Sequence, residues 1–581
     1  MNQPAQSEFN KPGALQASVL AAASLLFLLI ASDDFTRRLG VDRLYSEWLL
    51  LPIGGLISIA AFSAWRRFRG TAWISIPLLA SAAGIVVLAI LVGFQLTSPA
   101  AEGSITAYIS NAMIVHALLL TSTVVAFRSG IERNPRLVYE TAFARLTLVL
   151  VFFVFLSLVS GSTLTLSDSP GVCRSWPFCG PNLVPQNSLE WISVLHSLTV
   201  GVSGVLVLWA LALGWRTQRY QPSTLVMLTA AAILFLAQIL IGAMLSLRAS
   251  DITMVALHVA TGPAVWAAVI VLAVNVGLEG PSAESEGLSA FRSNGLGERV
   301  RDFLTLTKPI IVLLLLATTL AGMVVGLRAW PPAGTIFWTL LGGALAAGGS
   351  GAINQFIDRD VDAKMKRTAR RPLAAGRLTP AEGLAFGVGL CLLAFFLLAI
   401  FVNMLAAMLS VAGMFYYVWL YSIVLKKATV QNIVIGGGAG SIPPLVGWAA
   451  ATGSLTLPAL LLFAIIFFWT PPHFWALALV RSKDYARGGI PMLPVVRGER
   501  ETRRQILIYT FELVAITLLA PVFGLAGIVY FAGAVVLGGV LIAVAWRLWR
   551  EYSPKLAWRM YRWSSMYLLF LFLMMMADAL I

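Results

Sequence analysis

The chain has 581 residues, of which 59% are hydrophobic and only 12% are charged, and its formal net charge is +15. This composition excludes a water-soluble protein of such length, because too few polar side chains are available to cover its surface. The positive charge could indicate nucleic-acid binding. Basic membrane proteins, however, usually owe their surplus to cytoplasmic loops, so we expect no nucleic-acid partner.

Apolar runs of near 20 residues recur along the whole chain, separated by short polar turns, and we count about seventeen of them. A segment that faces lipid must satisfy its own backbone hydrogen bonds, so each run is expected to be a helix. We therefore predict an all-α integral membrane protein with two bundles, of about eight and about nine transmembrane helices. The first run is followed by Asp33 and Asp34 without a small-residue cleavage site, which favours a retained helix over a signal peptide.

Basic residues concentrate in alternate loops, whereas the turns between them, near Glu102 and Asp251, carry little charge. Positively charged loops normally remain in the cytoplasm. The N-terminus and the basic loops are thus predicted to lie on the cytoplasmic side of the cell membrane. The loops are 66–69, 128–136, 216–219, 364–377, 426–427, 481–504 and 547–559.

The stretch EGPSAESEGLSAFRSNGLGE, beginning at Glu279, has the composition of a flexible linker. It divides the chain into predicted modules 1–278 and 301–581, joined by a cytoplasmic linker over 279–300. Within the first module, YSEWLLLPIGG from Tyr45 and NSLEWISVLHS from Asn187 share a Glu-Trp pair. This pair suggests two four-helix repeats, although a belt of interfacial aromatic residues could also supply it.

Three of the four histidines, His116, His196 and His258, fall inside predicted spans of the first module. His196 and His258 lie at similar depths, roughly 10 Å below the outer face at 1.5 Å of rise per residue. Two imidazoles at equal depth can ligate one heme axially, so we predict a bound heme, with hydrogen-bonded helix packing as the alternative. The candidate heme ligands are His196, His258 and His116.

Two cysteines, Cys173 and Cys179, lie on the outer loop GVCRSWPFCGP. An oxidising compartment would permit a disulfide between them. Their spacing would also admit a metal ion, but no neighbouring histidine completes a zinc site. Cys391 lies in an apolar span and is interpreted as a small packing residue.

The segment INQFIDRDVDAKMKRTARRPLAAGRLTP, beginning at Ile353, carries the strongest chemical signal. Asn354, Asp358 and Asp362 are spaced by four residues and so share one face of a helix end. Carboxylates placed in this way suit Mg²⁺, a hard cation that is usually completed by substrate phosphates and water. A solvated loop is the alternative, but acids beside a bilayer are costly and usually functional.

Basic residues follow the acids at once and would supply donors for diphosphate oxygens. A second cluster, Arg481-Ser482-Lys483-Asp484-Tyr485, lies two cytoplasmic loops further on and can close over the same cavity. The predicted catalytic set is therefore Asn354, Asp358, Asp362 and Asp484. The predicted diphosphate-binding set is Lys364, Arg367, Arg371, Arg481 and Lys483.

A carbocation needs an apolar pocket with aromatic ring faces. Tyr417, Tyr421 and Trp475 are candidates, although aromatic residues in membrane helices more often pack or form interfacial belts. His473, the one histidine of the second module, could contact a heme iron or a propionate, or could serve as a hydrogen-bonded packing residue.

The second module resembles the UbiA-type prenyltransferases through NQFIDRDVD, and their heme O synthase branch through several further segments. These are LTKPI from Leu306, LKKATVQNIVIGGGAGSIPPLVGW from Leu425 and HFWALALVRSKDYARGGIPMLPV from His473. The resemblance implies a Mg²⁺-dependent transfer of a farnesyl group from farnesyl diphosphate to a vinyl group of heme B, giving heme O. It further implies a role with terminal oxidase assembly factors. A related enzyme acting on a quinone precursor or chlorophyllide is the alternative, but the single acid at Asp484 argues against it.

The first module resembles heme A synthase through CRSWPFC, its histidine helices and its doubled four-helix plan. That family carries a histidine pair in each repeat, whereas the first repeat here offers only His116, and Leu50 and Ile53 stand where a partner is expected. Glu47 could handle protons or could be an ordinary interfacial acid. Oxidation of heme O to heme A and a non-catalytic role as heme carrier or electron-transfer cytochrome both stay open.

Overall fold

The computed structural model describes residues 13–38, 49–67, 72–97, 102–128, 136–166, 185, 188–247, 252–280 and 295–581. All regular secondary structure in these ranges is helical, as predicted. The chain divides into two compact units, Met1–Ser293 and Asn294–Ile581. The predicted linker lies largely outside the described residues, so the domain boundaries stay a prediction.

Fourteen helices among the described residues are long and apolar enough to cross a membrane, six in the first unit and eight in the second. The expected count of about seventeen is therefore not confirmed. The first unit also has two shorter apolar stretches, Leu15–Ala31 within the helix Ala14–Arg38 and Leu50–Ala64 within the helix Leu50–Arg67. In the second unit, α19 (Gly498–Leu518) begins with the charged sequence GERETRR, which interrupts its apolar run.

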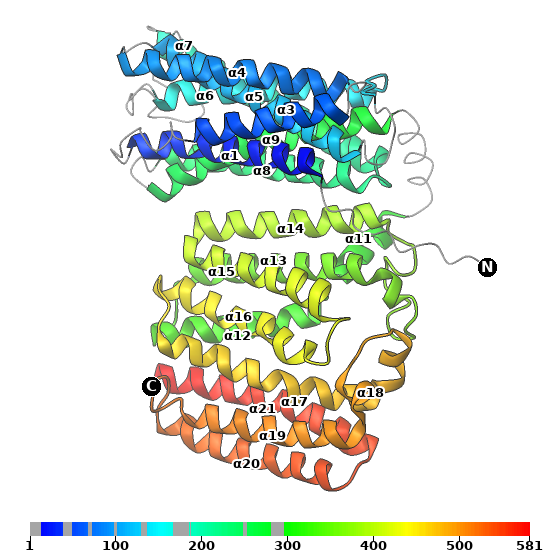
Figure 1. The fold of residues 1–581 in the computed structure, drawn as a ribbon. Coiled ribbons are helices and arrows are strands. Elements are labelled where there is room, and N and C mark those ends of the chain that lie inside the picture. The colour runs from blue at the N-terminus through cyan, green and yellow to red at the C-terminus, as the bar shows by residue number, and fades with distance from the viewer. Residues whose placement is uncertain are drawn as a thin grey trace, which may run out of the picture. The chain divides into compact units, whose positions relative to one another are not determined.

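The first unit is a bundle of long helices that run side by side (Figure 1). Its packing order repeats: α1 packs on α3, α3 on α4, α4 on α5 and α1 on α5, while α6, α7, α8 and α9 pair in the same way. Two four-helix repeats would produce this arrangement. The helices are α1 (Ala14–Arg38), α3 (Leu50–Arg67), α4 (Ala72–Thr97), α5 (Glu102–Arg128), α6 (Ala142–Leu166), α7 (Ser188–Thr217), α8 (Pro222–Leu247) and α9 (Ile252–Glu279).

The second unit begins with a short helix, α11 (Leu296–Leu306), and continues with long helices packed on their sequence neighbours. They are α12 (Pro309–Leu327), α13 (Ala333–Asp362), α14 (Pro380–Phe401), α15 (Met404–Phe415), the π-helix η1 (Tyr416–Leu425), α16 (Asn432–Thr452) and α17 (Leu457–Arg487). A short α18 (Leu493–Val496) then leads to α19, α20 (Ile528–Arg550) and α21 (Pro554–Leu580).

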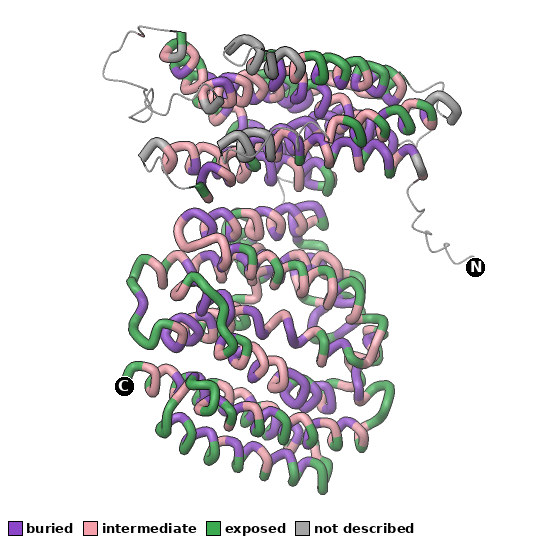
Figure 2. Tube along the Cα trace, turned by 60° about the vertical axis from the view of Figure 1, so that its left-hand side comes forward, coloured by how far each residue is buried: buried purple, intermediate pink, exposed green. Residues whose placement is uncertain are grey.

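Local sequence explains where several of these helices begin. The chain enters α14 through a capping box, in which Thr379 and Glu382 bond each other's backbone N–H groups, and Pro380 occupies the first turn. Glycines then allow α12 and α16 to approach closely, because a side chain at Gly322 or Gly447 would collide with the facing backbone. Buried positions recur along the helices with exposed ones between them (Figure 2).

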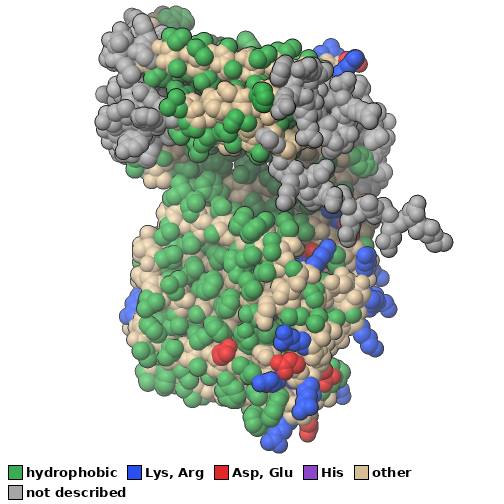
Figure 3. Space-filling model, in the orientation of Figure 1, with side chains coloured by type: hydrophobic (Ala, Val, Ile, Leu, Met, Phe, Trp, Pro, Cys, Tyr) green, Lys and Arg blue, Asp and Glu red, His purple; other side chains and the backbone are tan. Residues whose placement is uncertain are grey.

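The surface of the second unit has the polarity that a membrane requires. Large apolar side chains such as Ile310, Leu313 and Val536 are exposed on long helices, where lipid would solvate them. Hydrophobic side chains cover much of the face in Figure 3, while most basic side chains of this unit gather toward one end of its helices. This separation of charge is typical of a multi-pass membrane protein.

Candidate functional site

The predicted acidic face forms at the end of α13. Asn354, Asp358 and Asp362 are exposed by only 3%, 1% and 2%, so all three polar side chains are buried. Burying a carboxylate is costly unless charged or polar groups surround it. The partners of these side chains therefore define what the site can bind.

Asp358 is the centre of this network. Its Oδ2 accepts a hydrogen bond from Asn354 Nδ2 over 2.8 Å and also forms an ion pair with Lys426 Nζ. Its Oδ1 is buried and has no hydrogen-bond partner among the described residues. Buried polar atoms are normally satisfied, so an unsatisfied carboxylate oxygen at this point fits a cation ligand.

Asn354 is held from a second side by Lys308. The Lys308 ammonium donates to Asn354 Oδ1 over 2.8 Å and to the Tyr417 hydroxyl over 3.3 Å. Lys308 directly precedes α12 and has a left-handed backbone conformation with φ 55°. Burial and the nearby charge of Arg371 lower the pKa of Lys308 to about 8.

Asp362 is paired with a residue of the loop that follows it. Arg371 Nη1 donates to Asp362 Oδ2 over 2.7 Å, so one predicted diphosphate ligand does reach the acidic face. Lys364 and Arg367, by contrast, are exposed on the same loop. Together Lys308, Arg371 and Lys426 place three positive charges around two buried carboxylates.

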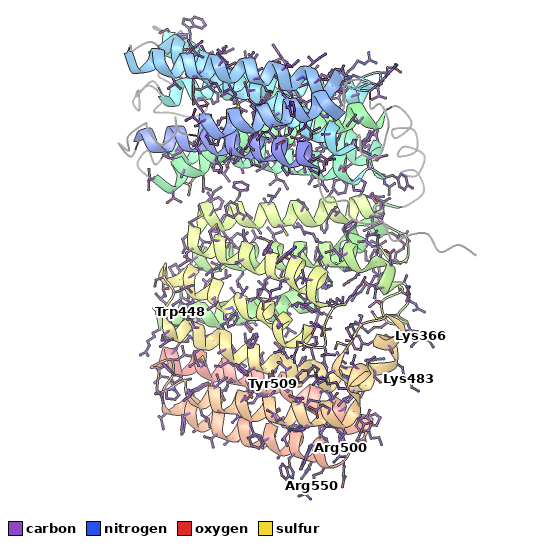
Figure 4. The ribbon with its side chains drawn as sticks, viewed as in Figure 1. Lys366, Trp448, Lys483, Arg500, Tyr509 and Arg550 are labelled. Atoms are coloured by element: carbon purple, nitrogen blue, oxygen red, sulfur yellow. The ribbon has the colours of Figure 1, made fainter. Side chains whose placement is uncertain are left out.

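The second predicted cluster meets this loop. Asp484 Oδ1 accepts a hydrogen bond from the backbone N–H of Lys366 over 3.2 Å and pairs with Arg487 at 3.2 Å. Val361, in the last turn of α13, and Met365, just beyond that helix, share a small apolar core with Ile490 and Met492 beyond α17. The two loops are thus brought together, and Lys366 and Lys483 project at the same end of the unit (Figure 4).

Tyr417 and Tyr421 lie on η1, which packs against α13. Their rings are stacked, with centroids 5.6 Å apart and planes inclined by 15°. Ser422 follows them and accepts a hydrogen bond from Asn354 Nδ2 over 3.0 Å. The wider turn of a π-helix is often found at functional sites, and here it brings these tyrosines, Ser422 and Lys426 toward the acidic face.

No group of three or more His, Cys, Asp or Glu side chains in the described ranges is arranged to hold a metal ion by itself. The acidic face contributes two carboxylates and one amide. A hard cation bound there would need further oxygen ligands from water or from a phosphorylated substrate, which is the usual situation for Mg²⁺.

A family model described as the UbiA prenyltransferase family matches residues 315–572, which include the whole acidic face. The protoheme IX farnesyltransferase of Roseiflexus castenholzii is 38% identical over 526 residues, covering 87% of this chain and 96% of that protein. That of Symbiobacterium thermophilum is 51% identical over 284 residues, covering 48% of this chain and 95% of that protein.

The chain belongs to the protoheme IX farnesyltransferases of the UbiA prenyltransferase family. It is therefore a prenyltransferase, and the predicted resemblance of the second module is confirmed. Among solved structures, a digeranylgeranylglyceryl phosphate synthase covers 49% of this chain and 99% of its own, at 17% identity and a TM-score of 0.43. A UbiA homologue from Archaeoglobus fulgidus bound to DMAPP and Mg²⁺ covers 47% and 99%, at 18% identity and a TM-score of 0.38.

Three residues that were predicted to belong to the prenyltransferase site make their described contacts with residues outside the acidic face. His473 lies on α17 and faces α21, where its Nδ1 is 2.8 Å from Ser564 Oγ. Trp475 is buried in the core of the unit and meets Tyr509 edge to face at 5.3 Å. The Arg481 guanidinium lies 5.8 Å above the ring of Trp558 on α21.

The histidines of the first unit lie inside its bundle. His196 Nδ1 is 3.0 Å from the Ser157 carbonyl oxygen, and a side chain at Gly161 would come within 2.7 Å of its ring. His258 packs against Gly242, and its Nε2 lies 3.4 Å from Gln238 Nε2. His116 is fully buried, and its Nδ1 has no described hydrogen-bond partner. Cys173, Cys179 and Glu47 lie outside the described residues, and Cys391 is a partly buried free thiol.

Sequence reasoning did not single out Lys308, Lys426 or Ser422 as site residues. Lys308 lies 46 residues before Asn354, and Lys426 lies 68 residues after Asp358, so no local spacing connects them. Lys308 occurs in LTKPI, a segment quoted for its resemblance to the family, and Lys426 occurs in LKKATVQN and in the basic loop 426–427. The sequence signal that could have identified Lys308 and Lys426 is an ionisable residue at the start or end of an apolar span.

Proposed function

We propose that this prenyltransferase transfers a farnesyl group from farnesyl diphosphate to a vinyl group of protoheme IX (heme B), giving heme O for terminal oxidases. The observation that carries the proposal is the buried carboxylate pair with one unsatisfied oxygen, surrounded by three positive charges. Relatives named protoheme IX farnesyltransferase, matched over nearly their whole length, support the choice of donor and acceptor.

The acidic face fits Mg²⁺. Asp358 would contribute its unsatisfied Oδ1, and Asp362 a carboxylate oxygen at the next turn of α13. Asn354 orients Asp358 through its 2.8 Å hydrogen bond. When bound, Mg²⁺ would neutralise the diphosphate charge that grows as the allylic C–O bond breaks.

The side chains around the acids then have distinct tasks. Lys426 and Arg371 pair with the two carboxylates, and Lys308 lies beside Asn354, so all three are placed to share the negative charge of the departing diphosphate. The vinyl carbon attacks the allylic cation and forms the new C–C bond. Water captures the resulting cation as a hydroxyl group and releases one proton, so no protein nucleophile is consumed.

The stacked rings of Tyr417 and Tyr421 supply the apolar, electron-rich surface that an allylic cation requires. Tyr417 also lies beside Lys308, whose ammonium is 5.8 Å from its ring centroid. The prenyl chain would therefore extend from the acidic face along η1. We assign Lys364 and Arg367, on the loop after α13, and Lys483 and Asp484, near the end of α17, to the entrance of the site, because Asp484 joins these two segments through the backbone of Lys366.

For the first unit we propose a bound heme ligated by His196 and His258. A ring nitrogen that bonds a carbonyl must carry the proton, so the Ser157 contact leaves Nε2 of His196 with its lone pair. The close approach of Gly161 and Gly242 to the two imidazoles gives each ring a fixed position. Oxidation of heme O to heme A and simple heme transfer or electron transfer both remain compatible with one bis-histidine heme.

We place the protein in the cell membrane with the acidic face toward the cytoplasm. The concentration of basic side chains at one end of the second unit supports this orientation, since basic residues are enriched on the cytoplasmic side. Heme O made there would be delivered to terminal oxidase assembly factors.

Expression of the full chain in a bacterial host that lacks both heme O and heme A synthases tests the proposal. Extracted hemes are separated and identified by mass. Heme O alone supports prenyl transfer, and heme A in addition supports oxidation by the first unit. Protoheme alone, with the chain present in the membrane at normal level, would show that the proposed function is wrong.

A further inference from the structure

A cationic pocket on α21 plays no part in the chemistry described so far. It is lined by Lys555, Trp558, Arg559 and Arg562, which occupy positions i, i+3, i+4 and i+7 of the helix. Residues at this spacing share one helical face. The lining contains three positive charges, one indole ring and no carboxylate. We call these four residues the α21 pocket.

A residue of α17 adds a fourth positive charge. The helix departs from regular geometry at Arg481 (φ −108°, ψ 15°), and the Arg481 guanidinium lies 5.8 Å above the ring of Trp558. Arg481 is three residues before Asp484, which accepts a hydrogen bond from the loop that follows the acidic face. The α21 pocket therefore opens at the same end of α17 as the prenyl-transfer site.

Aromatic rings lead from this pocket into the interface between α21 and α17. Trp558 meets Tyr561 edge to face at 5.5 Å, and Tyr561 stacks on His473 at 4.4 Å. His473 in turn stacks on Trp469 at 4.2 Å, and Ser564 fixes its ring by a 2.8 Å hydrogen bond. A positively charged rim thus adjoins a series of packed aromatic rings, in which Trp469 and Tyr561 both stack on His473.

We propose that the α21 pocket binds the propionate carboxylates of the porphyrin acceptor, with the ring edge directed toward the aromatic series; this rests on the proposed function. Protoheme carries two carboxylates on one edge of a flat apolar macrocycle, and the pocket offers guanidinium forks beside aromatic faces. Guanidinium groups bind carboxylates in a bidentate geometry. The diphosphate of the donor, by contrast, is served by Lys308, Lys426 and Arg371 at the acidic face.

The test uses the full chain in vesicles of zwitterionic lipid, with Arg559→Gln, Arg562→Gln and the double variant. Arg550→Gln is the matched control, because Arg550 also lies over a tryptophan ring, 5.4 Å from Trp546, but does not line the pocket. Arg550 projects at the same end of the unit (Figure 4). Initial rates are measured with protoheme and with its dimethyl ester, in which the propionate charges are absent, and binding is followed by the heme absorption band.

We expect the double variant to raise the KM and Kd for protoheme about tenfold, as loss of two partly exposed charge pairs would do. The KM for farnesyl diphosphate, the affinity for the dimethyl ester and all constants of Arg550→Gln should stay within about twofold. The heme site proposed for the first unit is the same in every variant, so it cancels from the comparison.

Equal loss of affinity for protoheme and its ester, or no loss for either, would overturn the assignment. An anionic lipid headgroup has similar chemistry, and the pocket would belong to lipid if the variants lost only stimulation by phosphatidylglycerol vesicles. Failure of the proposed function gives a different pattern. In that case no prenylated product forms in any variant, whereas ester-sensitive heme binding that depends on Arg559 and Arg562 would still support the pocket assignment.

Discussion

Lys308 donates a hydrogen bond to Asn354 Oδ1 over 2.8 Å, and this contact fixes the orientation of the amide. With its oxygen toward Lys308, Asn354 directs its Nδ2 to Asp358 and to Ser422. The asparagine of the sequence motif therefore acts in this arrangement through the aspartate, by holding one of its oxygens. Lys308 completes the chain of contacts and is itself partly buried.

Substitution Lys308→Met should raise the KM for farnesyl diphosphate by about tenfold or more, because a desolvated charge beside the diphosphate is lost. Lys308→Arg should recover part of the affinity by keeping the charge. Initial rates in membrane vesicles, at a series of farnesyl diphosphate concentrations, measure the KM of both variants. Lys427→Met, which removes an exposed lysine on the loop after η1, is the control and should behave as wild type. An unchanged KM in Lys308→Met would contradict the assignment.

Removal of either buried carboxylate should affect the metal requirement. Asp358→Asn and Asp362→Asn are expected to lower kcat by about 10²-fold to 10³-fold, since each loses charge that would hold the cation. Asp360→Asn provides the matched control on the same helix, because its side chain is 81% exposed. Chelation of Mg²⁺ should abolish activity in all enzymes, and added Mg²⁺ should restore it in wild type and Asp360→Asn. Normal rates in the two buried variants would refute the site.

Lys426 should control how strongly Mg²⁺ stabilises the protein. Its ion pair with Asp358 is buried, so Lys426→Ala leaves an uncompensated carboxylate and should lower the melting temperature of the metal-free protein. Added Mg²⁺ would supply the missing positive charge and should raise this temperature more than in wild type. Thermal unfolding in detergent measures the difference, with Lys427→Ala as control. Equal Mg²⁺ responses would show that the metal binds away from Asp358.

The helices and the acidic triad could be predicted from sequence because both depend on short-range spacing. Long apolar runs predict spanning helices, and acids four residues apart share a face. The lysines that neutralise the triad could not be found in this way. Lys308 and Lys426 reach it from other helices, and the register of those helices depends on tertiary packing and, near Tyr417, on a π-helical segment.

Charge alone also failed to separate roles among the basic residues. Arg371 and Arg481 are equally basic in the sequence and were both expected at the diphosphate. The structure gives Arg371 an ion pair with Asp362, whereas Arg481 lies over Trp558. Arg481 is also the residue at which α17 departs from helical geometry, and its immediate sequence neighbours include no glycine or proline that would have predicted this.

The heme of the first unit should be lost independently of prenyl transfer. His196→Ala and His258→Ala are expected to remove a low-spin heme spectrum while heme O production continues, because the acidic face lies in the other unit. His116→Ala should keep the spectrum, since the corresponding repeat has Ile53, an apolar residue, where a partner imidazole is expected. Redox difference spectra and heme extraction separate the two outcomes. A normal spectrum in His258→Ala would exclude it as a ligand.

The close contact between α12 and α16 should be the most sensitive packing point in the prenyltransferase unit. A Cβ at Gly447 would collide with the backbone carbonyl of Thr319, which cannot move aside as a flexible side chain could. Gly447→Ala should therefore push the helices apart and destabilise the unit by about 1–3 kcal/mol, seen as a lower melting temperature in detergent.

Gly440 provides the control, because it lies on the same helix with nothing within 4 Å of an added Cβ. Gly440→Ala should leave the melting temperature unchanged or slightly raised, because alanine favours the helix by about 1 kcal/mol. Equal effects of the two substitutions would mean that helix propensity, rather than contact between α12 and α16, determines stability here.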